Sequence, residues 1–554
     1  MAVVQPDHVG DARGELVQQG SHGGLLGFAG PSIGAGTGGR PCRTASPDIR
    51  TRSGDLRPCS PAPRAPTIPS TERHKSMENF ETDYLVIGAG AMGMAFADSL
   101  FDERPDAHIT LVDRRHRPGG HWNDAYSFVR LHQPSAFYGV NSRELATGAV
   151  DEVGTNRGLH EMASGQAVLD HFDQLLRQKL LASGRVRFLS MTEHAGIDGQ
   201  GRQLLRSLLD GAEIAVSVRR KVVHATHTGT EVPATHAPRY QVAAGIHCVP
   251  INALPRLASP HARYTVVGSG KTGIDACLWL LQNGTDPSRI RWVMPNDAWF
   301  LDRANVQPGA EHLPRFFGSL AAQFECVAEA ESLDDLFMRL ESAGQLLRLD
   351  PSVRPTKYRC ATVTTQELAE LRRIGNILRM GRVRSITPGQ LSLDQGKADV
   401  LPGELFIDCT ACGIPLQAPI PVFEDDAAIH LQYVRQCGPS FSAAFIAAVE
   451  ARVAGGAAEK NAMCRPVPHP RDEAGWVTMQ AITLANRQAW ARHPGLMDWL
   501  ENSRLDYATR ARHQLAPEVM ERYVRAVKAA APRLPALLAA CRPESRERVP
   551  EPAC

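Results

Sequence analysis

Two copies of the glycine pattern GxGxxG constrain the fold of this 554-residue chain more than any other feature. The glycines are Gly88, Gly90 and Gly93 in the first copy, and Gly268, Gly270 and Gly273 in the second. Each copy follows a short apolar run and opens an amphipathic segment, as expected for the strand, turn and helix of a dinucleotide-binding βαβ unit. Glycine permits the tight turn, the approach of pyrophosphate and the packing of the helix, whose N-terminus faces the phosphates.

An acid in the expected place supports the first copy. The apolar run 109–112 leads into Asp113, which lies 20 residues after Gly93. This spacing suits a carboxylate that accepts a hydrogen bond from a ribose 2′-hydroxyl. The second copy contains the string GSGKT, which resembles an ATPase phosphate loop, but Thr265 stands where that loop requires glycine. We therefore predict two dinucleotide sites and no ATPase.

The end of the next strand in the second unit favours a phosphorylated ribose. The apolar run 289–294 is followed by Pro295 and Asn296 rather than by an acid, and Arg303 lies slightly beyond. A missing carboxylate and a nearby cation both favour a 2′-phosphate, although Arg303 could equally be an ordinary surface residue. The residues expected to contact this second nucleotide are Gly268, Gly270, Lys271, Thr272, Gly273, Asn296 and Arg303.

The order of predicted strands indicates that one unit is inserted into the other. Short strands with glycine turns are expected over 185–228, a hairpin over 381–396, and an apolar strand ending in Asp408. A chain that leaves one Rossmann-like unit, builds a second and returns predicts an α/β fold with two dinucleotide-binding domains. The expected boundaries are 77–235 with 381–450 for the first domain, 236–380 for the second, and 451–545 for a C-terminal helical region.

Residues 1–76 differ from the rest of the chain. They contain 12 Gly and 9 Pro and show neither helical nor strand periodicity, which predicts a disordered tail. The ordered pattern begins at Met77, so we expect Met77 to be the working start and the residues before it to be a read-through.

Composition excludes several classes of protein. Lys plus Arg number 61 against 59 for Asp plus Glu, a net charge of +2 that is unlike the basic excess of nucleic-acid binders. No apolar run approaches the ~20 residues of a membrane span. The twelve cysteines form no spaced framework, and no metal-binding string is present, so we expect a cytoplasmic protein without a metal.

Four motifs together resemble the two-dinucleotide-binding-domain flavoproteins, and within them the flavin-containing monooxygenase-like oxidoreductases. They are GAGAMG (88–93), RPGGHW (117–122), GSGKTGID (268–275) and DCTACG (408–413), and the resemblance spans about 83–450. It implies FAD in the first domain and NADPH, with NADH possible, in the second. It also implies flavin contacts from Gly120, Trp122, Asp408, Thr410 and Gly413, beside Gly88, Gly90, Gly93 and Asp113.

The segment after the RPGGHW motif is expected to run along the flavin ring. Arg130, His132 and Gln133 are the donors placed there, because a reduced flavin is anionic and is stabilised by such groups. The alternative is that they satisfy buried backbone groups. Cys409 and Cys412 form a CxxC pair, which is interpreted as a buried structural pair rather than as a redox dithiol.

Three functions follow from these features. The first is an NAD(P)H-dependent FAD monooxygenase that uses O2 on a small organic substrate. The linker 240–255 has Gly245 and His247 but lacks the full monooxygenase fingerprint of the resembled family. The second function is therefore an NAD(P)H oxidoreductase that reduces a quinone or other acceptor without oxygen transfer. The third is a catalytically silent flavin-binding regulatory protein, which the six intact fingerprint glycines disfavour.

Overall fold

The computed structural model describes residues 78–257, 260–411, 413–415 and 417–540. All of them belong to one unit of the chain, His74–Cys554. The predicted tail over residues 1–76, the start at Met77 and the position of Cys412 lie outside the described residues.

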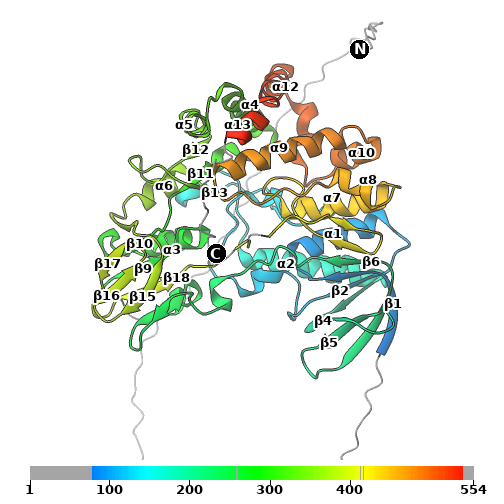
Figure 1. Cartoon of the computed structure of the whole chain (residues 1–554), viewed down its shortest axis with the longest axis horizontal. Helices are drawn as coiled ribbons and strands as arrows, with labels where there is room; N and C mark the ends of the chain where they lie inside the picture. Colours follow the sequence, from blue (N-terminus) through cyan, green and yellow to red (C-terminus); the bar gives the residue numbers. More distant parts are fainter. Residues whose placement is uncertain (1–77, 258–259, 412, 416, 541–554) are drawn as a thin grey trace, which may run out of the picture. The chain divides into compact units, whose positions relative to one another are not determined.

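The first sheet has the strand order β19-β20-β6-β1-β2-β3, with the hairpin β4–β5 attached to β6 (Figure 1). Its strands are β1 (Glu78–Ile87), β2 (Ile109–Val112), β3 (Val186–Leu189), β4 (Thr192–Ile197), β5 (Gln203–Ser207), β6 (Glu213–His224), β19 (Phe423–Glu424) and β20 (Ala428–His430). The pairs β1–β2, β2–β3, β1–β6 and β6–β20 are parallel. Helix α1 (Ala91–Glu103) connects β1 to β2, which is the crossover that parallel strands require.

The second sheet has the order β14-β10-β9-β18-β8, and all of its pairs are parallel. Its strands are β8 (His247–Pro250), β9 (Tyr264–Val267), β10 (Ile290–Val293), β14 (Asn376–Leu378) and β18 (Leu405–Asp408). Helix α3 (Lys271–Gln282) connects β9 to β10. The described residues therefore contain two Rossmann-like units, one around each glycine pattern.

Two small sheets accompany the second unit. A four-stranded sheet is formed by β7 (Gln241–Val242), β15 (Val383–Thr387), β16 (Gln390–Leu393) and β17 (Gly396–Asp399). A three-stranded sheet is formed by β11 (Ala298–Asp302), β12 (Leu346–Leu347) and β13 (Lys357–Val363).

The structure corrects the predicted return of the chain to the first domain. Strand β18 pairs with β8 and β9, and β15 pairs with β7, so residues 381–408 belong to the second unit. The chain rejoins the first sheet only at β19, and β20 pairs with β6. Strands β19 and β20 have only two and three residues and so a weaker sequence signal than the apolar strand β18, whose prediction in the first sheet is wrong.

The C-terminal region is helical, as predicted. Its helices are α8 (Ala457–Met463), α9 (Glu473–Trp490), α10 (Pro494–Asn502), α11 (Tyr507–Ala511), α12 (Pro517–Ala530) and α13 (Arg533–Ala540). Helices α12 and α13 pack on α4 (Leu313–Glu329), and α9 packs on α5 (Leu333–Ser342). The helical layer thus includes two helices that the sequence analysis placed in the second dinucleotide domain.

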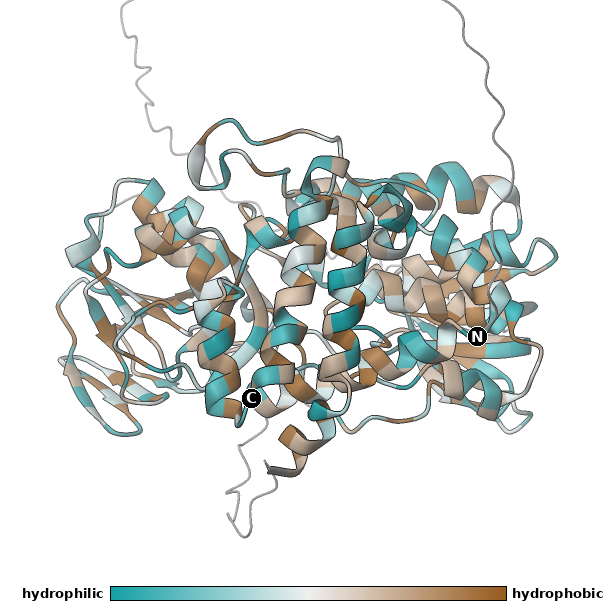
Figure 2. Cartoon of the chain, turned by 90° about the horizontal axis from the view of Figure 1, so that it is seen from above, coloured by the Kyte–Doolittle hydropathy of each residue, from teal (hydrophilic) through white to brown (hydrophobic). Residues whose placement is uncertain are grey.

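Helix α7 (Pro439–Arg452) packs along α1 and is buried on all sides because it consists mainly of Ala, Phe and Ile. Figure 2 shows hydrophilic and hydrophobic residues interspersed along the helices of the chain. Trp490 and Trp499 join the core of the first sheet, whereas Trp476 joins the core of the helical layer.

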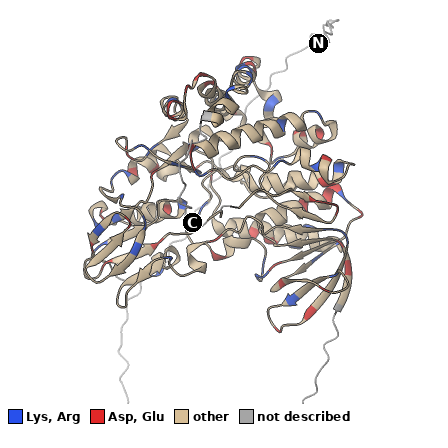
Figure 3. Cartoon of the chain, in the orientation of Figure 1, with Lys and Arg blue, Asp and Glu red and all other residues tan. Residues whose placement is uncertain are grey.

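Charged residues of both signs are dispersed over the described elements (Figure 3). Many of them form surface ion pairs, for example Arg177 with Asp173 and Arg522 with Glu325. Within the residues that the structure describes, no helix combines the length and the apolar character needed to cross a bilayer.

Candidate functional site

The first glycine turn lies between β1 and α1 and is closely packed. A Cβ atom at Gly93 would lie 1.9 Å from the carbonyl oxygen of Gly88, so only glycine lets α1 approach its strand this closely. Gly120 has φ +56° and faces Gly90, because a Cβ at Gly120 would lie 2.9 Å from the Cα of Gly90. The RPGGHW segment therefore lies against the first turn, and only backbone atoms of Gly90 and Gly120 meet where the two segments contact each other.

Asp113 stabilises this turn through two hydrogen bonds to backbone amides. Its Oδ2 accepts a hydrogen bond from the Ala89 amide at 2.7 Å, and its Oδ1 accepts one from the Arg115 amide at 2.8 Å. The carboxylate is buried. In this structure Asp113 holds the glycine turn in place at the end of β2, where the sequence predicts contact with a ribose.

The loop after Gly120 reaches both units. The Gly119 amide donates to the Ala89 carbonyl at 2.8 Å in the first turn. At the other end, the Tyr126 hydroxyl donates to Asp275 of α3 at 2.5 Å, and Val129 packs into the core of the second unit. The carboxylate of Asp275 also pairs with Lys271 at the start of α3.

Trp122 lies midway along this loop. Its Nε1 donates to the Tyr138 hydroxyl at 2.9 Å, and its ring packs against the cores of both units. Burial raises the pKa of Tyr138 to about 12. The neighbouring His121 lies with its ring stacked beside Trp122, and burial lowers the pKa of His121 to about 4.

His132 faces the second unit as a neutral imidazole. Its Nδ1 accepts a hydrogen bond from the Thr362 amide at 3.3 Å, which leaves the ring proton on Nε2. Burial, followed by the charges of Lys271 and Arg303, lowers the pKa of His132 to about 3. Gln133 is half-buried, whereas the side chain of Arg130 is exposed, so the structure does not bring the three predicted donors together.

The second glycine turn is more open than the first. A Cβ at Gly273 would lie 2.1 Å from the carbonyl oxygen of Gly268, so α3 is packed on β9 as α1 is on β1. A Cβ at Gly270 meets no atom within 4 Å. Lys271 and Thr272 are half-buried at the start of α3. The Asn296 carbonyl accepts a hydrogen bond from the Ser269 hydroxyl at 3.0 Å.

Arg303 is not available to a nucleotide phosphate, which corrects its predicted role. It is 2% exposed and forms a bidentate ion pair with Glu367 at 2.9 and 3.1 Å. Its remaining hydrogen bonds go to the carbonyls of His132 and Thr362 and to the amide oxygen of Asn156. The guanidinium therefore links buried segments of the protein. The prediction that Arg303 binds a 2′-phosphate, which rested on its sequence position near Asn296, is wrong.

Asp408, Thr410 and Gly413 are also placed differently from the prediction. A Cβ at Gly268 would lie 3.0 Å from the Cys409 carbonyl oxygen, so the end of β18 adjoins the second glycine turn and not the first. Asp408 accepts hydrogen bonds from the Thr410 hydroxyl at 2.6 Å and from Tyr240 at 3.2 Å, and burial raises the pKa of Asp408. Gly413 is exposed. Cys409 is a buried free thiol, and its suggested partner Cys412 lies outside the described residues.

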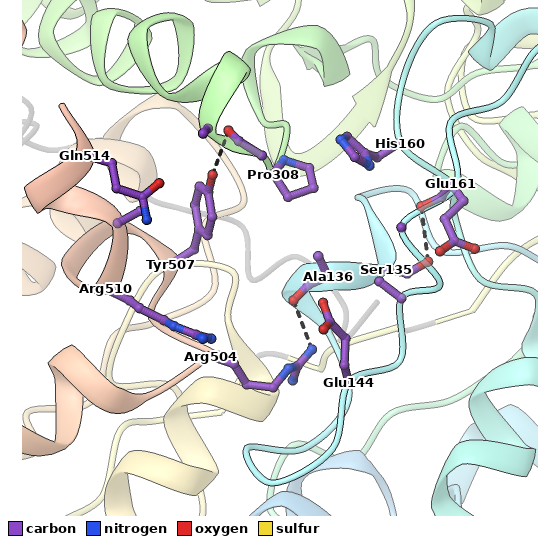
Figure 4. A pocket seen from close by; sticks show the side chains of 15 residues that line it. Ser135, Ala136, Glu144, His160, Glu161, Pro308, Arg504, Tyr507, Arg510 and Gln514 are labelled. Atoms are coloured by element: carbon purple, nitrogen blue, oxygen red, sulfur yellow. Dashed lines mark hydrogen bonds between the residues drawn. The ribbon is translucent and has the colours of Figure 1, made fainter. Parts of the chain in front are cut away.

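A cavity of about 350 Å³ lies just beyond the His132 segment. It is lined by residues from 135–161, 308–310 and 504–514 (Figure 4). Arg504 donates to the Ala136 carbonyl at 3.0 Å, and Tyr507 donates to the Gly309 carbonyl at 2.8 Å, so C-terminal helices form one wall. No sequence pattern predicts this cavity, because its walls come from segments far apart in the chain.

Three potential metal ligands meet at the rim of this cavity. The side-chain ligand atoms of His160, Glu311 and His312 lie within 4.8 Å of one another. His160 and His312 each have Nε2 at 3.7 Å from the Glu311 carboxylate. Imidazole and carboxylate are ligands that suit zinc or iron. No local spacing predicts this trio, since His160 lies about 150 residues before its neighbours.

A comparison with protein families supports the Rossmann-like fold of the first unit. Residues 86–140 match the family model described as NAD(P)-binding Rossmann-like domain. Among solved structures, the chain is similar to a flavin-containing monooxygenase from Stenotrophomonas maltophilia, at 14% identity and TM-score 0.39 over 75% of this chain and 99% of that one. It is similar to a polycyclic ketone monooxygenase from Thermothelomyces thermophila at 12% identity and TM-score 0.45, over 84% and 86%.

A third solved structure with similarity is a bacillithiol disulfide reductase from Bacillus cereus, at 14% identity and TM-score 0.33 over 60% of this chain and 78% of that one. The sequence relatives are much nearer. The uncharacterized protein Rv2000 of Mycobacterium tuberculosis and the uncharacterized protein Mb2023 of Mycobacterium bovis are each 48% identical over 449 residues, which are 81% of this chain and 82% of theirs. The chain belongs to the same protein family as these two mycobacterial proteins, and it carries a Rossmann-like NAD(P)-binding domain.

Proposed function

We propose that this chain is an FAD-dependent NAD(P)H oxidoreductase, with FAD at the first glycine turn and NAD(P)H at the second. One observation carries the proposal. The loop 119–129 is hydrogen-bonded to the first turn through Gly119 and to α3 of the second unit through Tyr126. Because ligands of parallel sheets lie beyond the carboxyl ends of the strands, both nucleotides would lie along this loop.

The residues present fit a dinucleotide at each turn. At the first turn, Gly90 and Gly120 face each other with no side chain between them, and α1 begins there, so that its N-terminal amides would face a pyrophosphate. At the second turn, the space beside Gly270 is open and α3 begins there. Bound FAD would accept a hydride from the nicotinamide and pass the electrons onward.

The chain's own residues would position and shield this exchange. His132 stays neutral near pH 7, since its pKa is about 3, and its Nε2–H can donate a hydrogen bond to a bound cofactor. Lys271 and Asp275 would orient the second nucleotide at the N-terminus of α3. Trp122 and Tyr138 would exclude water from the region between the two units.

The specific reaction proposed is oxygen transfer to a small organic substrate, in which the substrate, O2, NAD(P)H and one proton give the oxygenated product, water and NAD(P)⁺. The cavity beyond His132 has the size for such a substrate. NADPH is the proposed nucleotide because Met294–Asn296 carries no acid, and the nearby Asp297 is neutralised by Arg379 at 2.8 Å. A cytoplasmic location would supply this reductant.

Anaerobic reduction tests the proposal. The full chain is purified with its flavin, mixed with NADPH or NADH, and followed by flavin absorbance before and after O2 is admitted. We expect bound FAD, bleaching by NADPH, and reoxidation with little hydrogen peroxide when a substrate is present. Absence of bound flavin would refute the cofactor assignment. Stoichiometric peroxide with every candidate substrate would instead favour an oxidoreductase without oxygen transfer.

A further inference from the structure

A disulfide joins Cys360 of β13 to Cys437, which lies two residues before the first residue of helix α7. The two cysteines are 77 residues apart in the chain, and both join the core of the helical layer that contains Trp476. The bond therefore joins β13, in the sheet beside the second unit, to the segment before α7, which packs on α1 of the first unit.

Its position relative to the first site follows from the topology. Strand β20 is parallel to β6, and β6 is parallel to β1, so β20 and β1 end at the same edge of the first sheet. Helix α7 follows β20 as α1 follows β1. The start of α7, with Cys437 next to it, thus lies at the carboxyl edge of the sheet, which is where the first nucleotide would bind.

The other cysteine adjoins His132. Cys360 lies two residues before Thr362, whose amide donates to His132 Nδ1, and the Cys360 carbonyl accepts a hydrogen bond from the Thr362 hydroxyl at 3.3 Å. His132 belongs to the segment that is expected from the sequence to run along the flavin ring. Both halves of the disulfide are therefore tied to elements of the proposed cofactor site.

The backbone at both cysteines is held in an unusual conformation. Cys360 has φ +55° and Cys437 has φ +46°, and both are non-glycine residues in the left-handed region. Cys360 also lies within an irregularity of β13, where the pairing with β11 slips between Trp299 and Leu301. Left-handed non-glycine residues and β-bulges are concentrated at functional sites, because surrounding structure must impose them.

The two sulfur atoms differ in their environment. Cys360 is 5% exposed, whereas Cys437 is only partly buried. Cys437 precedes the N-terminus of the 14-residue helix α7, where the helix dipole stabilises a thiolate. The guanidinium of Arg435 lies close to the next residue, Gly438, and is paired with Asp506 at 2.9 Å. Cys437 is therefore the accessible sulfur and Cys360 the sheltered one.

We propose that Cys360–Cys437 is a redox-active disulfide, reduced to two thiols by NAD(P)H and reoxidised by a disulfide-containing substrate. This inference rests on the proposed function, which supplies the reductant. NAD(P)H gives two electrons and one proton, and solvent gives the second proton, so that the S–S bond is replaced by two S–H bonds and NAD(P)⁺ is released. In the return step the Cys437 thiolate attacks the substrate disulfide, one substrate thiol leaves, and Cys360 displaces the second.

The test measures the cysteines themselves. The flavin-loaded full chain is kept anaerobic, treated with NADPH or with buffer, alkylated under native conditions, and analysed by peptide mass spectrometry. We expect Cys437 to change from unlabelled to labelled when NADPH bleaches the flavin. The half-buried free thiol Cys248 is the internal reference, whose labelling should be the same in both samples.

Two variants separate the sulfurs. In Cys360→Ser, Cys437 should be labelled without NADPH, whereas in Cys437→Ser, the sheltered Cys360 should remain largely unlabelled. A disulfide substrate added after NADPH should restore protection of Cys437 in the unmodified protein, with release of two substrate thiols for each bond.

Each contrary result has its own meaning. Bleached flavin with Cys437 still bonded would overturn the redox role while leaving the proposed function intact. Labelling of Cys437 in the unmodified protein before any NADPH is added would show that the bond does not form, and would also overturn the redox role. If flavin is absent or is not bleached, the proposed function fails and this inference fails with it.

Discussion

Arg303 and Glu367 form a bidentate ion pair that is buried between the segment containing His132 and the helix α6 (Thr365–Leu371). Glu367 also caps that helix, since its carboxylate accepts the Thr364 amide at 2.8 Å. One guanidinium thereby joins β13, α6 and the carbonyl of His132. This arrangement positions the proposed cofactor segment instead of contacting a nucleotide.

Replacing Arg303 with Ala should therefore lower stability and leave coenzyme choice unchanged. Removing one partner of a buried ion pair leaves an unpaired charge and costs about 3–5 kcal/mol. We expect a lower urea midpoint and an unaltered ratio of kcat/KM for NADPH and NADH. The double variant Arg303→Met with Glu367→Leu should recover much of the lost stability. A kcat/KM that falls more for NADPH than for NADH would instead show that Arg303 contacts the 2′-phosphate.

The two glycine turns should be separable by matched substitutions. Gly90 and Gly270 have ordinary negative φ, and a Cβ at Gly90 has no neighbour nearer than 3.6 Å. Gly90→Val and Gly270→Val should therefore fold, and each should block the pyrophosphate at its own turn. We expect loss of bound flavin in Gly90→Val. In Gly270→Val the flavin should be retained but not reduced by NAD(P)H. Equal loss of flavin in both variants would contradict the assignment.

The sequence predicted the two Rossmann-like units because their signals are local. Strand, glycine turn and helix follow one another without interruption in each unit, over 78–103 and 264–282, and the close packing of Gly93 and Gly273 is on a glycine of the same turn. Strand pairing is not local in this sense. Strand β18 has the same apolar pattern whether it joins one sheet or the other, so the sequence alone could not decide its neighbours.

The candidate site depends still more on distant contacts. The partner of Arg303 is Glu367, 64 residues later, and a search confined to the end of the second strand could not find it. Cys437 lies 77 residues from Cys360, and neither belongs to a recognisable spacing. Residues that act in pairs across units are visible only after the chain has folded.

Acid should destabilise the fold through its buried neutral histidines. An unfolded histidine titrates near pH 6.5, whereas folded His132 has a pKa of about 3. Between these values the unfolded chain binds one more proton, so the free energy of unfolding falls as pH falls, by up to about 1.4 kcal/mol per pH unit for each such group. His121, His171 and His469, each with a pKa of about 4, add to this effect.

Urea midpoints at pH 7, 6 and 5 check this expectation. His132→Gln should reduce the loss of stability between pH 7 and pH 5, because one group with a lowered pKa has been removed. His513→Gln, at an exposed position, is the matched control and should keep the original slope. A flat pH profile for the unmodified protein would contradict the neutral state of these histidines.

The contact between Tyr126 and Asp275 gives the sharpest test of communication between the units. Tyr126→Phe removes one hydroxyl and leaves the ring packed in the core of the second unit, while Asp275 keeps its pairing with Lys271. Hydrogen bonds to charged groups contribute about 1.5–3 kcal/mol, so the loop should be held less firmly. We expect unchanged flavin content and slower flavin reduction at saturating NADPH, measured by stopped-flow absorbance.

Lys271→Met is the matched variant and should act mainly on nucleotide binding, raising the concentration of NADPH needed for half-maximal reduction. If Tyr126→Phe reduced flavin at the original rate, the loop between the two glycine turns would have no part in aligning the nucleotides.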